Sequence, residues 1–375
     1  MENVTDIIAK NIKERRKALG LTQMELGVLL GYSVKAISKW ESGKGAPPTV
    51  VLPLLAQMLR TDVDFLLREQ TERRFYLGID GGGTKTEFAL ADDEGHVIKT
   101  LLLGTSNPSD IGMSAAKEVW RTGISEVCAA LPKGSISLFA GLAGGTTHGV
   151  SEEIDRFFGS FGFHSVRHGS DAENAISAGL GQRDGIITIM GTGSVAFAQC
   201  GGKRHRVGGY GYLLADAGSG FAFGRDAIAA ALQYEDGSGE DTLLYESVKA
   251  KCGAKTVLEK LGLFYEGGKR AIADYASCVF DAYRHGDALA HVIVERNLQA
   301  VAQTVRGAGK HLKDASRIPV VLCGGICQSH GDVVVPVLGR YLSNENYEIS
   351  LCEHSLIYGA LRLAGMPEGR EEKGE

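Results

Sequence analysis

The sequence predicts an all-α helix-turn-helix domain at the N-terminus, followed by a larger α/β domain. Apolar residues at helical spacing and two helix-capping signals fill the first part of the chain. After residue 75, short apolar runs ending in glycine-rich turns alternate with helical stretches, which is typical of strands buried by helices. The length of 375 residues allows two or three domains.

We expect three helices at the start of the chain. Ile7, Ile8, Ile12 and Leu19 predict an amphipathic helix that ends near Gly20. The segment Thr22-Gln23-Met24-Glu25 is a capping box and predicts a second helix through Leu30. After a turn at Gly31-Tyr32, Ser33 is the expected N-cap of a third helix that runs through Glu41 and is ended by Gly43.

The third helix is the candidate DNA reader. Its spacing turns Val34, Ile37 and Trp40 inward and leaves four polar side chains outward: Ser33, Lys35, Ser38 and Lys39. Lys and Arg only slightly outnumber Asp and Glu in this part of the chain, so tight DNA binding would need a dimer. The alternative is a helical bundle that serves protein interaction or dimerisation.

The α/β part follows a polar linker around Arg73-Arg74. We expect the segment boundaries 1–68 (helix-turn-helix domain), 69–74 (linker), 75–170 (first half of the α/β domain), 171–366 (second half with a helical insertion) and 367–375 (polar tail). The expected strands are 86–90, 97–103, 135–142, 186–190 and 319–323, with a helix over 113–131 and a mostly helical stretch over 221–307.

Two glycine-rich turns at strand ends predict two phosphate-binding sites that face each other across a cleft. The first, within Gly78 to Thr86, has Gly81, Gly82 and Gly83 to expose backbone N–H groups, Thr84 and Lys85 to add a hydroxyl and a charge, and Asp80 to hold Mg²⁺. The second is Gly191-Thr192-Gly193-Ser194. The alternative for the first turn is a plain β-hairpin, and the signatures GxxxxGK[ST] and GxGxxG are absent from it.

Asp171 lies between the two turns, in a segment that follows a strand and opens a helix. A carboxylate there could accept the proton of a hydroxyl that attacks a γ-phosphate. The alternative is that Asp171 is only the N-cap of its helix, and the two roles are compatible.

Composition excludes few functions. Seven cysteines at irregular spacing argue against a disulfide framework, and Cys323, Cys327 and His330 suggest only a weak metal site that lacks a fourth ligand. No apolar run of about 18 residues and no signal-peptide pattern is present, so we expect a cytoplasmic protein without a membrane partner. The net charge of −5 does not indicate a substrate.

The N-terminal order of residues resembles the Xre/Cro helix-turn-helix family. LGLTQMELGVLLGYSVKAISKWESGKGAPP carries the resemblance, which covers about residues 5 to 67. It implies DNA binding through Gln23, Ser33, Lys35, Ser38 and Lys39.

Residues 75 to about 365 resemble the N-acetylglucosamine kinase branch of the BadF/BadG/BcrA/BcrD ATPase family, within the actin-like sugar kinases. The matching motifs are GIDGGGTKTEFALAD, SDAENAISAG, ITIMGTGSVAF and VVLCGGI. The resemblance implies two ribonuclease-H-like halves that close around ATP, Mg²⁺ and a sugar. It implies that Asp80 holds the metal ion and that Asp171 is the catalytic base. Phosphate and adenosine would contact Gly191, Thr192, Gly193, Ser194, Gly324 and Gly325. The sugar would contact Asn107, Gly144, Gly145, Asp171, Thr192, Tyr210 and Asp216.

One loop departs from the family pattern GGWGxxxGDEGS. Tyr210 replaces the tryptophan, Ala215 replaces a glycine, and Ala217 replaces a carboxylate while Asp216 is kept. Losing one hydrogen-bonding group in a sugar site typically costs about 1–3 kcal/mol, enough to change sugar preference without ending catalysis. The cysteine of the family's iron–sulfur activators and the CxCGxxGC zinc signature of the ROK kinases are both missing.

We therefore expect a homodimeric, ATP-dependent amino-sugar kinase joined to a DNA-binding module that links sugar status to transcription. The alternative is a transcription regulator whose kinase-like domain only senses sugar or nucleotide.

Overall fold

The computed structural model describes residues 3–67, 73–129, 131–146, 149–312, 315–343 and 345–367. Internal contacts divide the chain into two compact units, Met1–Arg73 and Arg74–Glu375. The predicted linker at 69–74 and the predicted tail at 367–375 fall mostly outside the described residues.

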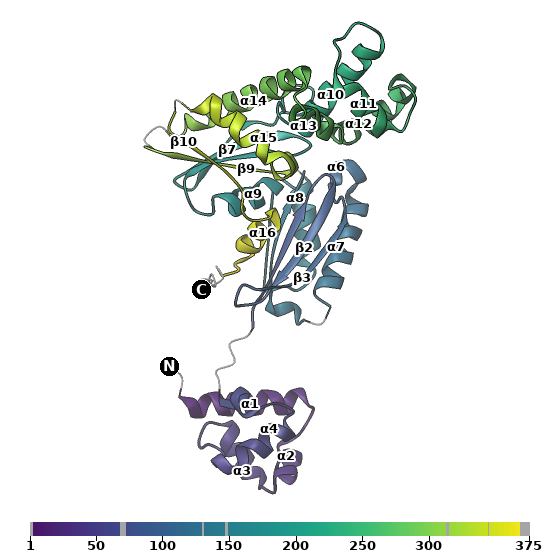
Figure 1. Cartoon of the computed structure of the whole chain (residues 1–375). Helices are drawn as coiled ribbons and strands as arrows, with labels where there is room; N and C mark the ends of the chain where they lie inside the picture. Colours follow the sequence, from purple (N-terminus) through teal and green to yellow (C-terminus); the bar gives the residue numbers. More distant parts are fainter. Residues whose placement is uncertain are drawn as a thin grey trace. The chain divides into compact units, whose positions relative to one another are not determined.

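The first unit is helical (Figure 1). Its helices share one apolar core, in which Ile12, Leu26, Ile37 and Leu55 are fully buried. The elements are α1 (Val4–Ala18), α2 (Gln23–Leu30), α3 (Val34–Glu41), a short 3₁₀ turn (Thr49–Val51), α4 (Leu52–Met58) and α5 (Val63–Leu67).

The capping signals of this unit are confirmed. Both hydrogen bonds of the capping box between Thr22 and Glu25 are present, and the Ser33 hydroxyl accepts from the Ala36 N–H at 3.3 Å. The inward position of Val34 was predicted wrongly, because its side chain is 44% exposed while Ile37 and Trp40 are buried. Val34 is the first residue of α3, so its Cβ tilts past the helix start rather than toward the core.

The second unit is built on two five-stranded sheets with the same strand order (Figure 1). The first sheet runs β3-β2-β1-β4-β5 and consists of β1 (Phe75–Gly81), β2 (Lys85–Ala91), β3 (Val97–Gly104), β4 (Ile136–Leu142) and β5 (Ser165–Gly169). The second sheet, written in the same direction, runs β8-β7-β6-β9-β10. It consists of β6 (Gly185–Met190), β7 (Ser194–Cys200), β8 (Lys203–Gly208), β9 (Ile318–Cys323) and β10 (Tyr347–Leu351).

The pairing directions repeat as well. In each sheet the first three strands form an antiparallel meander, and the remaining two add in parallel beside the first strand. The strands β1 and β6 are therefore equivalent central strands. Each continues through a glycine-rich turn into its antiparallel partner, so the two predicted phosphate turns occupy the same place in two copies of one motif.

Helices connect and cover the two sheets. The first half carries α6 (Pro108–Ile111), α7 (Met113–Val127) and α8 (Val150–Gly159), and α7 ends before the predicted Leu131. Helix α9 (Asp171–Gly179) contacts β1 and β4 of the first sheet and β6 and β9 of the second. The start of α9 therefore lies where the two sheets approach each other.

The last helix returns to the first half. Helix α16 (Leu356–Ala364) packs on β1, β2, β4 and α9, although it follows every strand of the second sheet. Two glycines permit the close approach: a Cβ on Gly78 would lie 3.0 Å from the Leu361 nitrogen, and one on Gly359 would lie 1.9 Å from the Asn174 carbonyl oxygen. The first half is thus completed by a segment from the far end of the chain.

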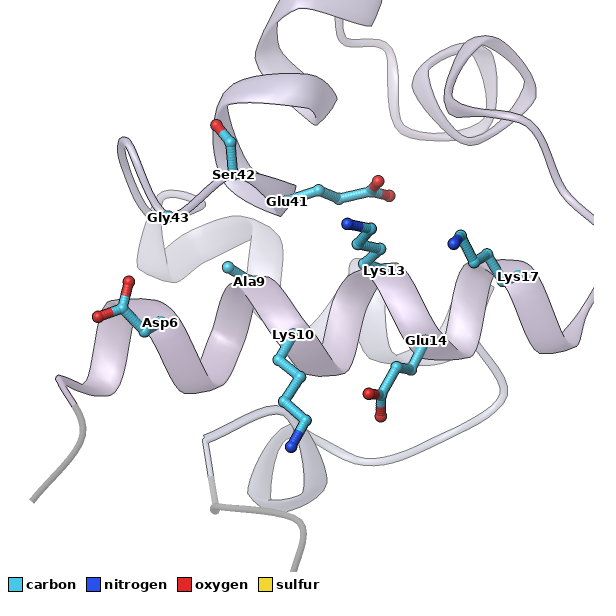
Figure 2. Close-up of a pocket in the computed structure, with 9 residues that line it drawn as sticks. All are labelled: Asp6, Ala9, Lys10, Lys13, Glu14, Lys17, Glu41, Ser42 and Gly43. Carbon is cyan, nitrogen blue, oxygen red and sulfur yellow. The ribbon is translucent and has the colours of Figure 1, made fainter.

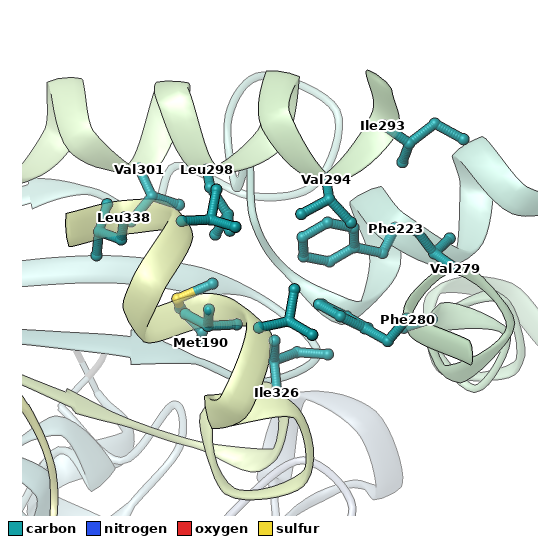
Figure 3. Close-up of a cluster of buried hydrophobic side chains, with 14 of the residues drawn as sticks. Met190, Phe223, Val279, Phe280, Ile293, Val294, Leu298, Val301, Ile326 and Leu338 are labelled. Carbon is teal, nitrogen blue, oxygen red and sulfur yellow. The ribbon is translucent and has the colours of Figure 1, made fainter. Parts of the chain in front are cut away.

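The stretch predicted to be helical is confirmed. It contains α10 (Gly220–Glu235), α11 (Leu243–Cys252), a 3₁₀ turn (Leu258–Lys260), α12 (Leu261–Ala273), α13 (Ala276–Arg284) and α14 (Ala288–Gly309), and α15 (Gly325–Leu342) follows β9. Figure 3 shows the core that joins these helices to the second sheet, with Phe223 and Phe280 packed at 4.8 Å between ring centroids.

The weak metal prediction at Cys323, Cys327 and His330 gains no support. Cys323 and Cys327 are buried thiols in apolar surroundings, and burial raises the pKa of Cys327 to about 12. The His330 ring stacks on Phe280 at 4.1 Å. Among the described residues, no group of three or more His, Cys, Asp or Glu side chains is arranged to hold a metal ion, and no helix is long and apolar enough to cross a membrane.

Candidate active site

Asp80 lies at the end of β1, where a neighbouring amide holds its carboxyl group. The Asn174 amide of α9 donates from Nδ2 to Asp80 Oδ1 at 2.7 Å. Burial, with a smaller contribution from the negative charge of Asp171, raises the pKa of Asp80 to about 7, against the opposing effect of the Asn174 hydrogen bond. A carboxylate whose charge is disfavoured in this way would gain from a bound cation.

The position of Asn174 depends on a glycine in β4. A Cβ on Gly141 would lie 2.3 Å from both polar atoms of the Asn174 amide, so only glycine leaves room for it. Asn174 is fully buried, and it also donates to the Ile79 carbonyl at 3.3 Å. Sequence reasoning missed this residue, although its place three residues after Asp171 puts both on one face of α9.

The first glycine turn is a hairpin turn, as the alternative reading proposed. Gly81 pairs with Thr86, and the Gly82 N–H donates to the Lys85 carbonyl at 3.0 Å. The turn is also anchored from outside, because the Thr105 hydroxyl donates to the Gly82 carbonyl at 3.1 Å. Gly83, Thr84 and Lys85 are exposed at its tip, so a hairpin turn and a phosphate site are compatible.

Asp171 is not the N-cap of its helix. Ser170 occupies that position, and its N–H donates to Glu173 Oε1 at 3.2 Å, while Asp171 is the first helical residue. The Asp171 carboxylate accepts the N–H of its neighbour Ala172 at 3.0 Å. Burial raises the pKa of Asp171, and the charge of Asp171 contributes to the raised pKa of Asp80.

The predicted sugar-contacting loops lie close together. A Cβ on Gly144 would be 2.9 Å from Asn107 Oδ1, and one on Gly145 would be 3.6 Å from the carbonyl of Gly169, just before Asp171. Asn107 also caps α6 by accepting from the Ser109 N–H at 3.1 Å, and it donates to Asp110 Oδ2 at 2.8 Å. These bonds use one N–H and one oxygen lone pair of the amide, which has two of each.

The second glycine turn is tied to the start of α10. The Gly220 N–H donates to the Gly191 carbonyl at 2.7 Å, and the Phe221 N–H donates to the Thr192 carbonyl at 3.3 Å. The carbonyls of Gly191 and Thr192 are therefore held by the start of α10. Thr192 and Ser194 remain half-buried.

Asp216 and Lys269 lie beside this turn. A Cβ on Gly193 would be 3.0 Å from Asp216 Oδ2 and 3.1 Å from Lys269 Nζ, and these two charged atoms are 3.5 Å apart. Tyr210, expected to line the sugar site, is 67% exposed and lies 5.7 Å from the Arg206 guanidinium. The ring contacting Lys269 is that of Tyr212.

The second pair of glycines ends β9 beside β6. Gly324 has a φ of +96°, and a Cβ there would lie 2.6 Å from the Met190 carbonyl oxygen, directly before the second glycine turn. The charge of Asp80 contributes to the raised pKa of the neighbouring, buried Cys323 thiol, after the larger effect of burial. The end of β9 therefore lies close to the second glycine turn.

The helix-turn-helix unit presents Lys35, Ser38 and Lys39 at its surface, as predicted. Gln23 is half-buried, and its Nε2 donates to Glu41 Oε2 at 2.8 Å. Glu41 is buried against Arg16 at 2.5 Å; burial alone would raise the pKa of Glu41, but Arg16 and Gln23 lower it.

A cavity of about 550 Å³ lies next to the end of α3, between α1 and the Ser42-Gly43 turn. Figure 2 shows the side chains that line it. The charged lining residues are balanced, because Lys10, Lys13 and Lys17 are matched by Asp6, Glu14 and Glu41.

Comparison with known proteins matches both units. The model of the BadF/BadG/BcrA/BcrD ATPase family matches residues 77–361, and a helix-turn-helix model matches residues 12–66. An N-acetylmuramic acid/N-acetylglucosamine kinase from Clostridium acetobutylicum is 29% identical, over 78% of this chain and 98% of that protein. A helix-turn-helix-type transcriptional regulator from Sinorhizobium medicae is 31% identical over 26% of this chain and 67% of that protein.

The fold has a match among solved structures. The crystal structure of a candidate N-acetylglucosamine kinase from Chromobacterium violaceum superposes with a TM-score of 0.62. It is 24% identical and covers 78% of this chain and 99% of that protein, a likeness that establishes the fold alone.

Proposed function

This chain belongs to the BadF/BadG/BcrA/BcrD ATPase family, and on that premise we propose that it is an ATP-dependent kinase of an amino sugar joined to a DNA-binding domain. One observation carries the kinase proposal. Asp80 lies at the end of the strand that leads into the first of two equivalent glycine turns, and burial raises the pKa of both Asp80 and Asp171. Glycine turns that can hold a nucleotide phosphate chain and a buried carboxyl group that can accept a proton are what a kinase needs, which supports the proposal.

Asp171 is the proposed base. A sugar hydroxyl would transfer its proton to the Asp171 carboxylate as its oxygen bonds to the γ-phosphorus, and the bond from phosphorus to the β-phosphate oxygen would break to leave ADP. The raised pKa makes Asp171 a better proton acceptor than an exposed aspartate. Magnesium, when bound, would offset phosphate charge, and the Asp80 carboxylate is the oxygen ligand that fits it.

The substrate proposal is the 6-hydroxyl of an N-acetylhexosamine. Asn107, Gly144 and Gly145 come together near the Asp171 segment, which supports a sugar pocket there. Ala217, in place of the carboxylate usual in the family pattern, is the position expected to shift sugar preference.

Turnover of ATP with a panel of sugars tests the kinase proposal. We expect ADP release with N-acetylglucosamine or N-acetylmuramic acid, and less with glucose. Asp171→Asn should lower kcat by about 100-fold or more. Wild-type turnover no higher than that of Asp171→Asn with every sugar would refute the proposal.

A second candidate function is a transcription regulator whose kinase-like domain only senses its ligand. Ala217 and the attached helix-turn-helix unit favour it. In that case sugar or nucleotide would change the DNA affinity of the full chain without turnover. We propose that the chain acts on DNA as a homodimer, because the small positive excess of the N-terminal unit offers one copy a weak electrostatic attraction.

The DNA proposal is tested with the DNA upstream of the protein's own gene. Binding should weaken as salt is added, and Lys35→Ala or Lys39→Ala should reduce it. Binding that is insensitive to salt and to both substitutions would return the unit to a protein-interaction role.

A further inference from the structure

We propose that Lys269 is a phosphate-binding residue of the nucleotide site, and that its present partner Asp216 is released to the sugar when the nucleotide binds. The proposal rests on the kinase function proposed above and names a residue that no motif indicated. As a consequence, nucleotide binding and sugar binding would be coupled through the ion pair of Lys269 and Asp216.

The position of Lys269 is the first support. Its Nζ would lie 3.1 Å from a Cβ on Gly193, so the ammonium group lies beside the second glycine turn. The side chain is 33% exposed, which leaves the charge accessible to a ligand entering there. A lysine beside backbone N–H groups at a glycine turn is well placed to attract a phosphate oxygen.

The state of Asp216 is the second support. Its side chain is 4% exposed, yet Oδ1 has no hydrogen-bond partner in the described part of the chain, and Oδ2 has only the Lys269 ammonium at 3.5 Å. A buried carboxylate normally has both oxygens hydrogen-bonded, because an unpaired buried charge is costly. Asp216 therefore has an unused acceptor for a donor such as a sugar hydroxyl.

The backbone on each side explains which partner can move. Asp216 has a φ of +67°, and two residues later the Gly218 N–H donates to the buried Asn297 Oδ1 at 3.0 Å. Asn297 is in turn held by Asp226 at 3.0 Å. Lys269 instead follows Gly268, whose φ of +58° and ψ of −153° interrupt α12. The aspartate is anchored, whereas the lysine extends from a break in its helix.

The competing explanation is that Lys269 only balances the charge of Asp216. That role predicts a loss of stability on substitution and no effect on nucleotide binding. A phosphate-binding role instead predicts weaker nucleotide binding on substitution, and it predicts this only for ligands that carry phosphates.

Calorimetric titration of the full chain with ADP and adenosine separates the two. Lys269→Met should weaken ADP binding about tenfold or more, the usual effect of losing one charged hydrogen bond, and should leave adenosine binding unchanged. Arg270→Met, which removes the same charge from the next, exposed position, is the matched control and should change ADP binding less than twofold. Lys269→Arg should restore most of the affinity, which excludes misfolding as the cause.

The coupling is measured with N-acetylglucosamine in the presence and absence of ADP. ADP should tighten sugar binding to the wild type, and Lys269→Met should bind sugar without ADP as tightly as with it. Equal ADP affinity in Lys269→Met and wild type would overturn this inference while leaving the kinase intact. A wild type that binds neither ADP nor sugar would overturn both.

Discussion

Replacing Asn174 by alanine should move the acid limb of the pH–rate profile. Asn174 donates the 2.7 Å hydrogen bond that favours the charged form of Asp80, whose pKa burial has raised to about 7. A hydrogen bond to a charged group contributes about 1.5–3 kcal/mol, which corresponds to about 1–2 pKa units. Without it, the Asp80 pKa should rise to about 8–9, and the ionised fraction at pH 7 should fall by about 5- to 50-fold.

The assay is kcat/KM for ATP between pH 5.5 and 9.5 at saturating sugar. The hydrogen bonds and charges that set the Asp171 pKa do not include Asn174, so the shift would report Asp80. Gln199→Ala is the control, because it removes a buried amide that bonds Gly181 and Arg183 instead. An acid limb that stays in place in Asn174→Ala would refute the reasoning, as would an equal shift in Gln199→Ala.

Three other substitutions or conditions have expected outcomes. Gly141→Ala should displace the Asn174 amide, because the new Cβ would lie 2.3 Å from it. Turnover should fall, and the acid limb of the pH–rate profile should move to higher pH as in Asn174→Ala. An unchanged pH–rate profile would show that the residues around Asn174 make room for the alanine. Glu41→Ala should destabilise the N-terminal unit by about 3–5 kcal/mol in thermal unfolding, because it leaves Arg16 buried without its partner, and unchanged unfolding would contradict this. The folded state binds the Asp80 proton more tightly than the unfolded state, so the free energy of unfolding should fall as pH rises from about 4 to about 7, by on the order of 4 kcal/mol. Asp80→Asn should remove that fall, and urea titrations at pH 4, 5.5 and 7 measure it.

Much of the chain could be predicted because the signals are local. The capping box of Thr22 and Glu25 and the N-cap Ser33 are interactions between residues three apart, so they depend little on the rest of the fold. The glycine turns after β1 and β6 are likewise set by short-range backbone geometry. The motifs around Asp80, Asp171 and the second turn then led to the family to which the chain belongs.

Other features were decided only by the folded structure. Val34 fits the apolar spacing of α3, but its place at the helix start leaves it in solvent. Asp171 could have been an N-cap until Ser170 was seen in that position. The amide of Asn174 became part of the site only because β1 and β4 present Asp80 and Gly141 to it.

The local chemistry of each segment could therefore be read from its residues, because caps, turns and apolar periods act over a few positions. The assembly of those segments could not. Lys269 lies 76 residues beyond Gly193, within an interrupted helix that carries no motif, and only folding brings its ammonium group to the second glycine turn. Helix α16 completes the first sheet for the same reason: packing surfaces are matched in space, and the order of the chain does not record which surfaces will meet.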